Sequence, residues 1–124
     1  MSGKIKVLIA EDSSVILNLT KKILEFQNCE ITSAKNGQMV IEMLGKENFN
    51  VILMDINMPG MDGIECTQQI RKMSDPVKAA VPIIAITGNA KNYSMDDFKS
   101  NGFTDFLQKP LNFDILVEKV KALA

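Results

Sequence analysis

The sequence contains no histidine and no tryptophan, and it has one tyrosine and two cysteines among its 124 residues. Without histidine, no imidazole of this chain can act as a general base, bind a metal ion or carry a phosphoryl group, which excludes most hydrolase triads and most zinc sites. Cys29 and Cys66 match no spacing typical of a metal or redox site. We interpret both as free thiols and expect a reducing, cytoplasmic location.

Long apolar runs and an imbalance of charge are also missing. No segment of the sequence is apolar for long enough to cross a bilayer, and the first apolar run, residues 7–10, is too short for a signal peptide. Lysine and arginine number 14 and aspartate and glutamate 15, so the net charge is −1, without the basic stripe that binds nucleic acid. We therefore expect neither membrane insertion nor direct nucleic-acid binding.

Along the chain, segments with the apolar pattern of a strand alternate with segments that have the apolar pattern of a helix. Short β-branched runs predict strands, and longer segments with apolar residues every three or four positions predict helices. The predicted strands are 5–10, 30–34, 51–55, 81–87 and 105–108, and the predicted helices lie near 15–26, 39–44, 63–73, 91–100 and 113–123, the third ended by Asp75-Pro76. This alternation predicts one α/β domain, residues 1–124, with helices on both faces of a parallel sheet.

Functional side chains stand where four of these strands end. They are Glu11 and Asp12 after the first strand, Asp55 at the end of the central strand, Thr87 at the end of the fourth and Lys109 after the fifth. Because the carboxyl ends of parallel strands share one edge of the sheet, where open α/β folds bind ligands, we expect these side chains to converge. Taken singly, the acids can also cap helices, the threonine favours strands and the lysine suits a solvated surface.

The acids of this set repel one another unless a cation lies between them. Two like charges ~4 Å apart repel by roughly 4 kcal/mol at an effective dielectric constant of about 20. Mg²⁺ relieves this repulsion because it prefers oxygen ligands, and it leaves positions for phosphoryl oxygens. A carboxylate is a competent nucleophile, so the set suits an aspartyl phosphate on Asp55, with Lys109 as a second cation and Thr87 as a neutral donor.

Taken in order, the motifs around these residues resemble the response-regulator receiver domain of two-component signalling over essentially the whole chain. They are Glu11-Asp12, Ala34-Lys35-Asn36-Gly37, Met54-Asp55, Met58-Pro59-Gly60-Met61-Asp62-Gly63, Ile86-Thr87 and Lys109-Pro110. The resemblance, which includes chemotaxis-type regulators, implies a flavodoxin-like, doubly wound fold with five parallel strands in the order 2-1-3-4-5 and five helices. It also implies that the Lys109-Pro110 peptide bond is cis.

The resemblance assigns metal and acceptor roles to individual residues. It implies that Asp55 is the phospho-acceptor, and that Asp12 and Asp55 bind Mg²⁺ through their carboxylates. Asn57 is expected to bind the ion through its backbone carbonyl, and Glu11 through a water molecule. Asn57 and Asn89 are expected to tune hydrolysis, with a phosphoryl lifetime of seconds to minutes.

The resemblance also assigns the switch. Thr87 and Lys109 are expected to contact the phosphoryl group, and Thr87 and Phe106 are expected to move together on phosphorylation. Phe106 stands where tyrosine is common in the family, so we expect a ring that is buried or nearly so and a weaker aromatic signal. Gly88 follows Thr87 where alanine is usual, which should loosen this loop.

The implied function is a signalling switch. The chain would take a phosphoryl group from a phosphohistidine of a histidine kinase or histidine phosphotransfer protein, and it would catalyse only its own phosphorylation and dephosphorylation. We expect a monomer or weak dimer, not an enzyme with an external substrate. The first helix is expected to meet the donor through Ser14, Val15 and Asn18. A downstream protein is expected to bind the helix at 91–100, the last strand and the last helix, through Lys91, Tyr93, Phe106 and Phe113.

Several alternatives stay open at the level of sequence. The chain suits a free-standing regulator, a phosphorelay shuttle or the receiver domain of a hybrid histidine kinase, and an inert receiver-like domain would share the fold. An aspartate-nucleophile phosphatase needs a second acid two residues after the nucleophile, where this chain has Asn57. A flavin-binding module needs a phosphate loop rich in serine, threonine and glycine after the first strand, where Glu11 and Asp12 would repel a phosphate.

Overall fold

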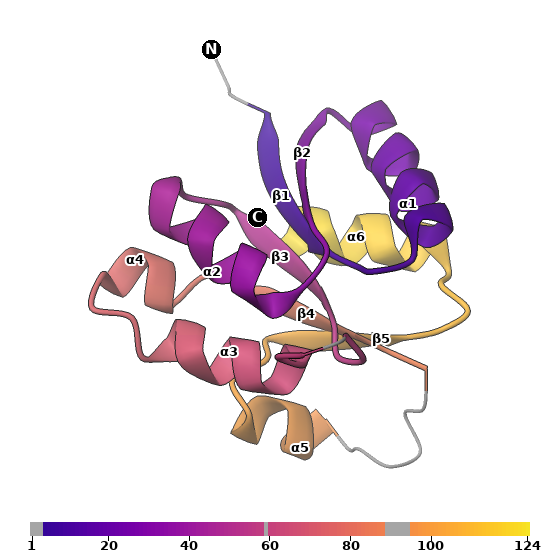
Figure 1. The fold of residues 1–124 in the computed structure, drawn as a ribbon. Coiled ribbons are helices and arrows are strands. Elements are labelled where there is room, and N and C mark those ends of the chain that lie inside the picture. The colour runs from indigo at the N-terminus through magenta and orange to yellow at the C-terminus, as the bar shows by residue number, and fades with distance from the viewer. Residues whose placement is uncertain (1–3, 59, 89–94) are drawn as a thin grey trace.

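A five-stranded parallel sheet forms the centre of the protein in a computed structural model that describes residues 4–58, 60–88 and 95–124 (Figure 1). Its strands are β1 (Ile5–Ala10), β2 (Cys29–Ala34), β3 (Val51–Asp55), β4 (Ile83–Thr87) and β5 (Asp105–Gln108). They lie in the order β2-β1-β3-β4-β5, and every neighbouring pair is parallel. The predicted flavodoxin-like fold class and strand order are confirmed.

Helices cover both faces of this sheet, so that the sheet is the middle of three layers (Figure 1). The described residues form α1 (Ser14–Phe26), α2 (Gly37–Lys46), α3 (Gly63–Arg71), α4 (Pro76–Ala79), α5 (Met95–Ser100) and α6 (Phe113–Leu123). The apolar sides of α1 and α6 pack on one face, and those of α2, α3 and α5 pack on the other. Because every neighbouring pair of strands is parallel, the carboxyl ends of all five strands lie at one edge of the sheet.

The helix count differs from the prediction of five, because the described residues include a one-turn helix, α4. Asp75 caps this helix, since its carboxylate accepts a hydrogen bond from the backbone N–H of Val77 at 2.9 Å. Pro76 occupies the first helical position. A backbone N–H at this position makes no hydrogen bond within the helix, so proline loses nothing there. The Asp75-Pro76 pair therefore starts a new helix, whereas the sequence analysis treated it only as the end of the preceding one.

The fourth strand begins later than predicted. β4 begins at Ile83 and not at residue 81. Pro82 has no N–H to give to the ladder, although its carbonyl accepts a hydrogen bond from the backbone N–H of Ile52 at 2.9 Å. Of the helix predicted at 91–100, the part from Met95 onward is confirmed as α5, and residues 91–94 lie outside the described residues. No helix in the described ranges is long and apolar enough to cross a membrane.

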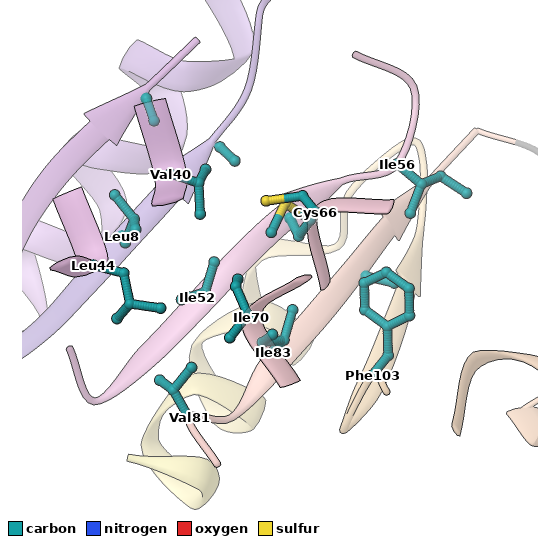
Figure 2. Close-up of a cluster of buried hydrophobic side chains, with 14 of the residues drawn as sticks. Leu8, Val40, Leu44, Ile52, Ile56, Cys66, Ile70, Val81, Ile83 and Phe103 are labelled. Carbon is teal, nitrogen blue, oxygen red and sulfur yellow. The ribbon is translucent and has the colours of Figure 1, made fainter. Parts of the chain in front are cut away.

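Apolar side chains fill the spaces between the sheet and its helices. All five residues of β3 are buried, which agrees with the continuous apolar run that predicted a central strand. Figure 2 shows one of these spaces, where Leu44 of α2 and Ile70 of α3 pack over Ile52 of β3. Cys29 and Cys66 are free thiols, as predicted, and the structure shows that both are buried. Burial raises the pKa of the Cys66 thiol to about 12, so this thiol stays protonated and unreactive.

Arg71, at the end of α3, joins three backbone segments on the side of the sheet opposite its open edge. Its Nε donates to the carbonyl of Gly102 at 2.8 Å, and its Nη1 donates to the carbonyls of Ala79 and Val81, each at 2.7 Å. Burial lowers the pKa of the guanidinium, which stays charged at neutral pH nonetheless. This one side chain therefore holds α4 and the approach to β4 against the turn that precedes β5.

Replacing Arg71 with methionine should lower the free energy of unfolding by about 1–3 kcal/mol, because partly buried carbonyls lose their donor. Lys72→Met, at the exposed neighbouring position, is the matched control and should change stability by less than about 0.5 kcal/mol. Urea unfolding followed by circular dichroism measures both variants. Equal stability of the two variants would contradict the joining role of Arg71.

Candidate functional site

Asp55 ends β3 between β1 and β4, and it is only 1% exposed. Ile56, the next residue, extends the pairing with β4, since its backbone N–H donates to the carbonyl of Ile86 at 3.1 Å. The chain then turns, and the backbone N–H of Asn57 donates to Asp55 Oδ1 at 2.9 Å. This bond orients the Asp55 carboxylate at the mouth of the sheet, where the exposed Asn57 begins the loop to α3.

Glu11 and Asp12 follow β1, the strand beside β3. The pairing of Ala10 with Met54 brings the ends of the two strands together. Glu11 is 4% exposed, and its Oε2 accepts a hydrogen bond from the backbone N–H of Ser13 at 3.1 Å, whereas Asp12 is exposed. Ser13, not either acid, is the N-cap of α1. Helix capping therefore does not explain why two acidic residues, Glu11 and Asp12, follow β1.

The predicted acids and the predicted lysine form one cluster. One carboxylate oxygen from each of Glu11, Asp12 and Asp55 lies within 4.8 Å of the others. The Lys109 Nζ lies 3.2 Å from Asp55 Oδ2 and 3.5 Å from Glu11 Oε1. Lys109 reaches the cluster from the end of β5, where its backbone N–H donates to the carbonyl of Thr87 at 2.8 Å. The structure thus brings together side chains that stand at the ends of separate strands.

Burial and mutual repulsion perturb the ionisation of this cluster. Burial is the main cause that raises the pKa of Glu11 to about 7, and the neighbouring Asp55 adds to the rise, although the Ser13 backbone N–H and Lys109 oppose it. Burial acts to lower the pKa of Lys109, but the carboxylates of Asp55 and Glu11 outweigh it, so that this pKa lies above its ordinary value. Lys109 therefore offsets part of the repulsion, and the raised pKa of Glu11 favours its neutral form.

The donor set of the cluster fits a hard divalent cation. Its three carboxylates supply oxygen ligands, which Mg²⁺ prefers, and the exposure of Asp12 leaves room for the water molecules that Mg²⁺ retains. The sequence has no histidine, and both cysteines are buried elsewhere in the core, so a zinc site is a poorer match. The residues present are therefore suited to Mg²⁺.

The two residues of the predicted switch lie in the sheet near this cluster. Thr87 ends β4 and is 1% exposed, one position beyond the residue that pairs with Asp55. Phe106 in β5 is half-buried, which is less than predicted, and its ring contacts the apolar core. The Lys109-Pro110 peptide bond is cis, as predicted. Three further residues named from the sequence, Asn89, Lys91 and Tyr93, lie outside the described residues.

Phe98 in α5 is a contact that the sequence analysis missed. Its ring stacks on Phe106, with centroids 4.9 Å apart and planes 17° apart, and it meets Phe103 edge-on at 5.8 Å. Phe98 is 1% exposed. The signal was Phe98 itself, the one phenylalanine in a mostly polar segment, which indicates the side of the predicted helix that faces the core.

An open parallel sheet with an acidic, lysine-bridged site at the ends of its strands defines a doubly wound α/β domain of the flavodoxin-like class. The sequence profile of the response regulator receiver domain matches residues 7–121. The chain belongs to this family, and it is a receiver domain of two-component signal transduction.

Curated relatives of the chain include both sensor kinases and response regulators. The CAI-1 autoinducer sensor kinase/phosphatase CqsS of Vibrio cholerae is 33% identical over 117 residues, which cover 94% of this chain and 17% of CqsS. The transcriptional regulatory protein ResD of Bacillus subtilis is 34% identical over 122 residues, which cover 98% of this chain and 49% of ResD. The chain therefore spans half or less of the length of these relatives.

Solved receiver structures share the fold over nearly the whole chain. The receiver domain of the sensor histidine kinase PA1611 from Pseudomonas aeruginosa has a TM-score of 0.87 at 26% identity, covering 98% of each chain, and it was solved with a magnesium ion in its active-site cleft. The chemotaxis protein CheY4 of Vibrio cholerae has a TM-score of 0.86 at 28% identity, covering 98% of this chain and 100% of that chain.

The metal-free protein should lose stability as the pH rises from about 4.5 to about 7, because of Glu11. Its pKa is about 7 in the folded state and 4.5 ordinarily. Between these values the folded state holds a proton that the unfolded state has lost, so the free energy of unfolding decreases with pH. Urea unfolding in EDTA measures this slope, which Glu11→Gln should reduce and Glu25→Gln, at an exposed site on α1, should not. An unaltered slope in Glu11→Gln would contradict the prediction.

Proposed function

We propose that this receiver domain accepts a phosphoryl group on Asp55 from a phosphohistidine of a partner protein, in a reaction that depends on Mg²⁺. The observation that carries the proposal is the convergence of Glu11, Asp12 and Lys109 on Asp55 at the open edge of the sheet. In the reaction, a carboxylate oxygen of Asp55 bonds to phosphorus while the phosphorus–nitrogen bond breaks and its electron pair returns to the donor imidazole.

The proposed metal ligands are the carboxylates of Asp12 and Asp55 and the backbone carbonyl of Asn57, with Glu11 acting through water. The bound ion would supply positive charge to the phosphoryl oxygens. Lys109 supplies a second positive charge, and its Nζ already lies within 3.2 Å of an Asp55 oxygen. The chain's own contribution is thus positioning and charge stabilisation, which is most of what phosphoryl transfer requires.

Phosphorylation would be transmitted through Thr87 and Phe106 to the surface formed by α5, β5 and α6. Thr87 ends β4 one position beyond the residue that pairs with Asp55, and in this proposal its hydroxyl would respond to a new phosphoryl group. Phe106 stacks on Phe98 of α5. A change in the Phe106 ring would therefore alter α5 directly, and the proposed consequence is altered binding of a downstream protein.

An apolar stripe on α1 supports the proposed docking of the phosphohistidine donor. Val15, Leu19 and Phe26 are 77%, 48% and 90% exposed, and their spacing places them on one side of the helix. A groove of about 250 Å³ adjoins the stripe and is lined by Val15, Leu19, Lys109 and Phe113, among others. A helical donor whose apolar side chains covered this stripe would bring its histidine close to Lys109 and hence to Asp55.

Acetyl phosphate and Mg²⁺ should add one phosphate to the wild-type protein, because Asp55 is the nucleophile. Asp55→Asn should not react, whereas Asp75→Asn, which alters only the cap of α4, should react normally. Intact-protein mass spectrometry follows both the gain and its decay, which should take seconds to minutes. A phosphate that still adds to Asp55→Asn, or adds equally well in EDTA, would overturn the proposal. Turnover of external phosphomonoesters would instead indicate a phosphatase.

Leu19→Ser should slow phosphoryl transfer from a histidine phosphotransfer protein by about tenfold, since losing one apolar contact of about 1.4 kcal/mol has this effect. The rate with acetyl phosphate should not change, because that donor needs no docking surface. Val77→Ser, at a 65% exposed apolar residue on α4, is the matched control for both rates. Equal slowing of both reactions by Leu19→Ser would indicate damage to the site and not loss of docking.

A further inference from the structure

The first residue of α3 lies closer to the end of β3 than a side chain would allow. A Cβ atom on Gly63 would lie 2.5 Å from the carbonyl oxygen of Asp55, 2.7 Å from Cα of Ile56 and 3.0 Å from Cγ of Met54. The two shortest contacts are with backbone atoms, so no change of side-chain rotamer relieves them. Gly63 has a helical backbone as the first residue of α3. Glycine is therefore required at this position for space and not for an unusual backbone angle.

The same contact closes the loop that begins with Asn57. The backbone N–H of Gly63 donates to the carbonyl of Ile56 at 3.2 Å, which joins the two ends of the loop. At the α3 end, the Asp62 carboxylate accepts a hydrogen bond from the backbone N–H of Glu65 at 2.8 Å and caps the helix. The loop that carries the proposed carbonyl ligand is thus fastened to β3 at its start and to α3 at its finish.

The start of α2 contacts this loop from another side. A Cβ atom on Gly37 would lie 3.0 Å from Cγ, Sδ and the carbonyl oxygen of Met61. The Cys66 thiol of α3 donates to the carbonyl of Gly37 at 3.5 Å and so links the two helices. Because two of the three Met61 atoms belong to a flexible side chain, this contact can yield more easily than the backbone contact at Gly63.

We propose that Gly63 is a positioning residue for the Mg²⁺ site, since its missing side chain lets α3 hold Asp55 and the Asn57 carbonyl at the separation that one ion needs. The inference rests on the proposed function of that site. α3 cannot simply withdraw from a larger residue, because Cys66 and Ile70 anchor it in the core, each with 0% exposure. A methyl group at Gly63 would instead displace the end of β3 and the loop that follows.

The test is the Mg²⁺ affinity of Gly63→Ala, read from the amide NMR shifts of Asp55 and Asn57 during a Mg²⁺ titration. Gly63→Ala should bind Mg²⁺ about tenfold more weakly than the wild type, as is common when support for a metal ligand is lost. Gly45→Ala is the matched glycine control, because a Cβ there would meet nothing within 4 Å, and its affinity should equal that of the wild type. Gly37→Ala should fall between the two.

Val120→Ala distinguishes a positioning role of Gly63 from a purely structural one. It removes a fully buried side chain of α6 on the other face of the sheet. This variant should lose stability and keep its Mg²⁺ affinity. If Gly63→Ala binds Mg²⁺ as tightly as the wild type, the inference is overturned and the proposed function stands. If the wild type itself binds no Mg²⁺, the proposed function fails first.

Hydrogen exchange on the wild type keeps the inference testable if Gly63→Ala does not fold. Mg²⁺ binding should slow exchange of the Gly63 amide, because that amide closes the loop that would hold the ion. The Gly45 amide in α2 should exchange at the same rate with and without Mg²⁺. A Gly63 amide that exchanges equally fast in both conditions would overturn the inference.

Discussion

Like charges meet at the open edge of the sheet, and much of this protein's chemistry follows from how they are balanced. Oxygens of Glu11, Asp12 and Asp55 lie within 4.8 Å of one another, and at that distance two such charges repel by roughly 3 kcal/mol at an effective dielectric constant of about 20. Lys109 bridges two of the acids, and Glu11 holds a proton more strongly than an ordinary carboxylic acid. The same repulsion would favour a bound divalent cation over an empty site.

The sheet can hold these charges together because the strands beneath them are paired and buried. β1 and β3 end side by side, β3 is buried throughout, and α3 approaches so closely that only glycine fits at residue 63. Beside this edge lies the uncovered apolar stripe of α1, which contains Val15 and Leu19. A buried acidic site next to an exposed apolar stripe agrees with the proposed transfer of a phosphoryl group from another protein.

Sequence patterns predicted most of the fold and the composition of the candidate site. The continuous apolar run before Asp55 identified the central strand, and the ends of β1 and β5 identified the neighbours of Asp55 in the cluster. The one-turn helix after Asp75 was missed, because a local cap was interpreted only as a helix end. The stacking of Phe98 on Phe106 was also missed, since Phe98 comes from a helix with little apolar periodicity of its own.

The sequence by itself determined the fold class, the residue types at the strand ends and the family to which the chain belongs, because these depend on local periodicity and on ordered motifs. Only the tertiary structure decided that Lys109 bridges Glu11 and Asp55, that the Glu11 carboxyl is buried, and that Gly63 touches the backbone of β3. The reason is physical: distances between segments far apart in the chain, and the loss of water around a charge, are set by packing, which no local pattern of residues contains.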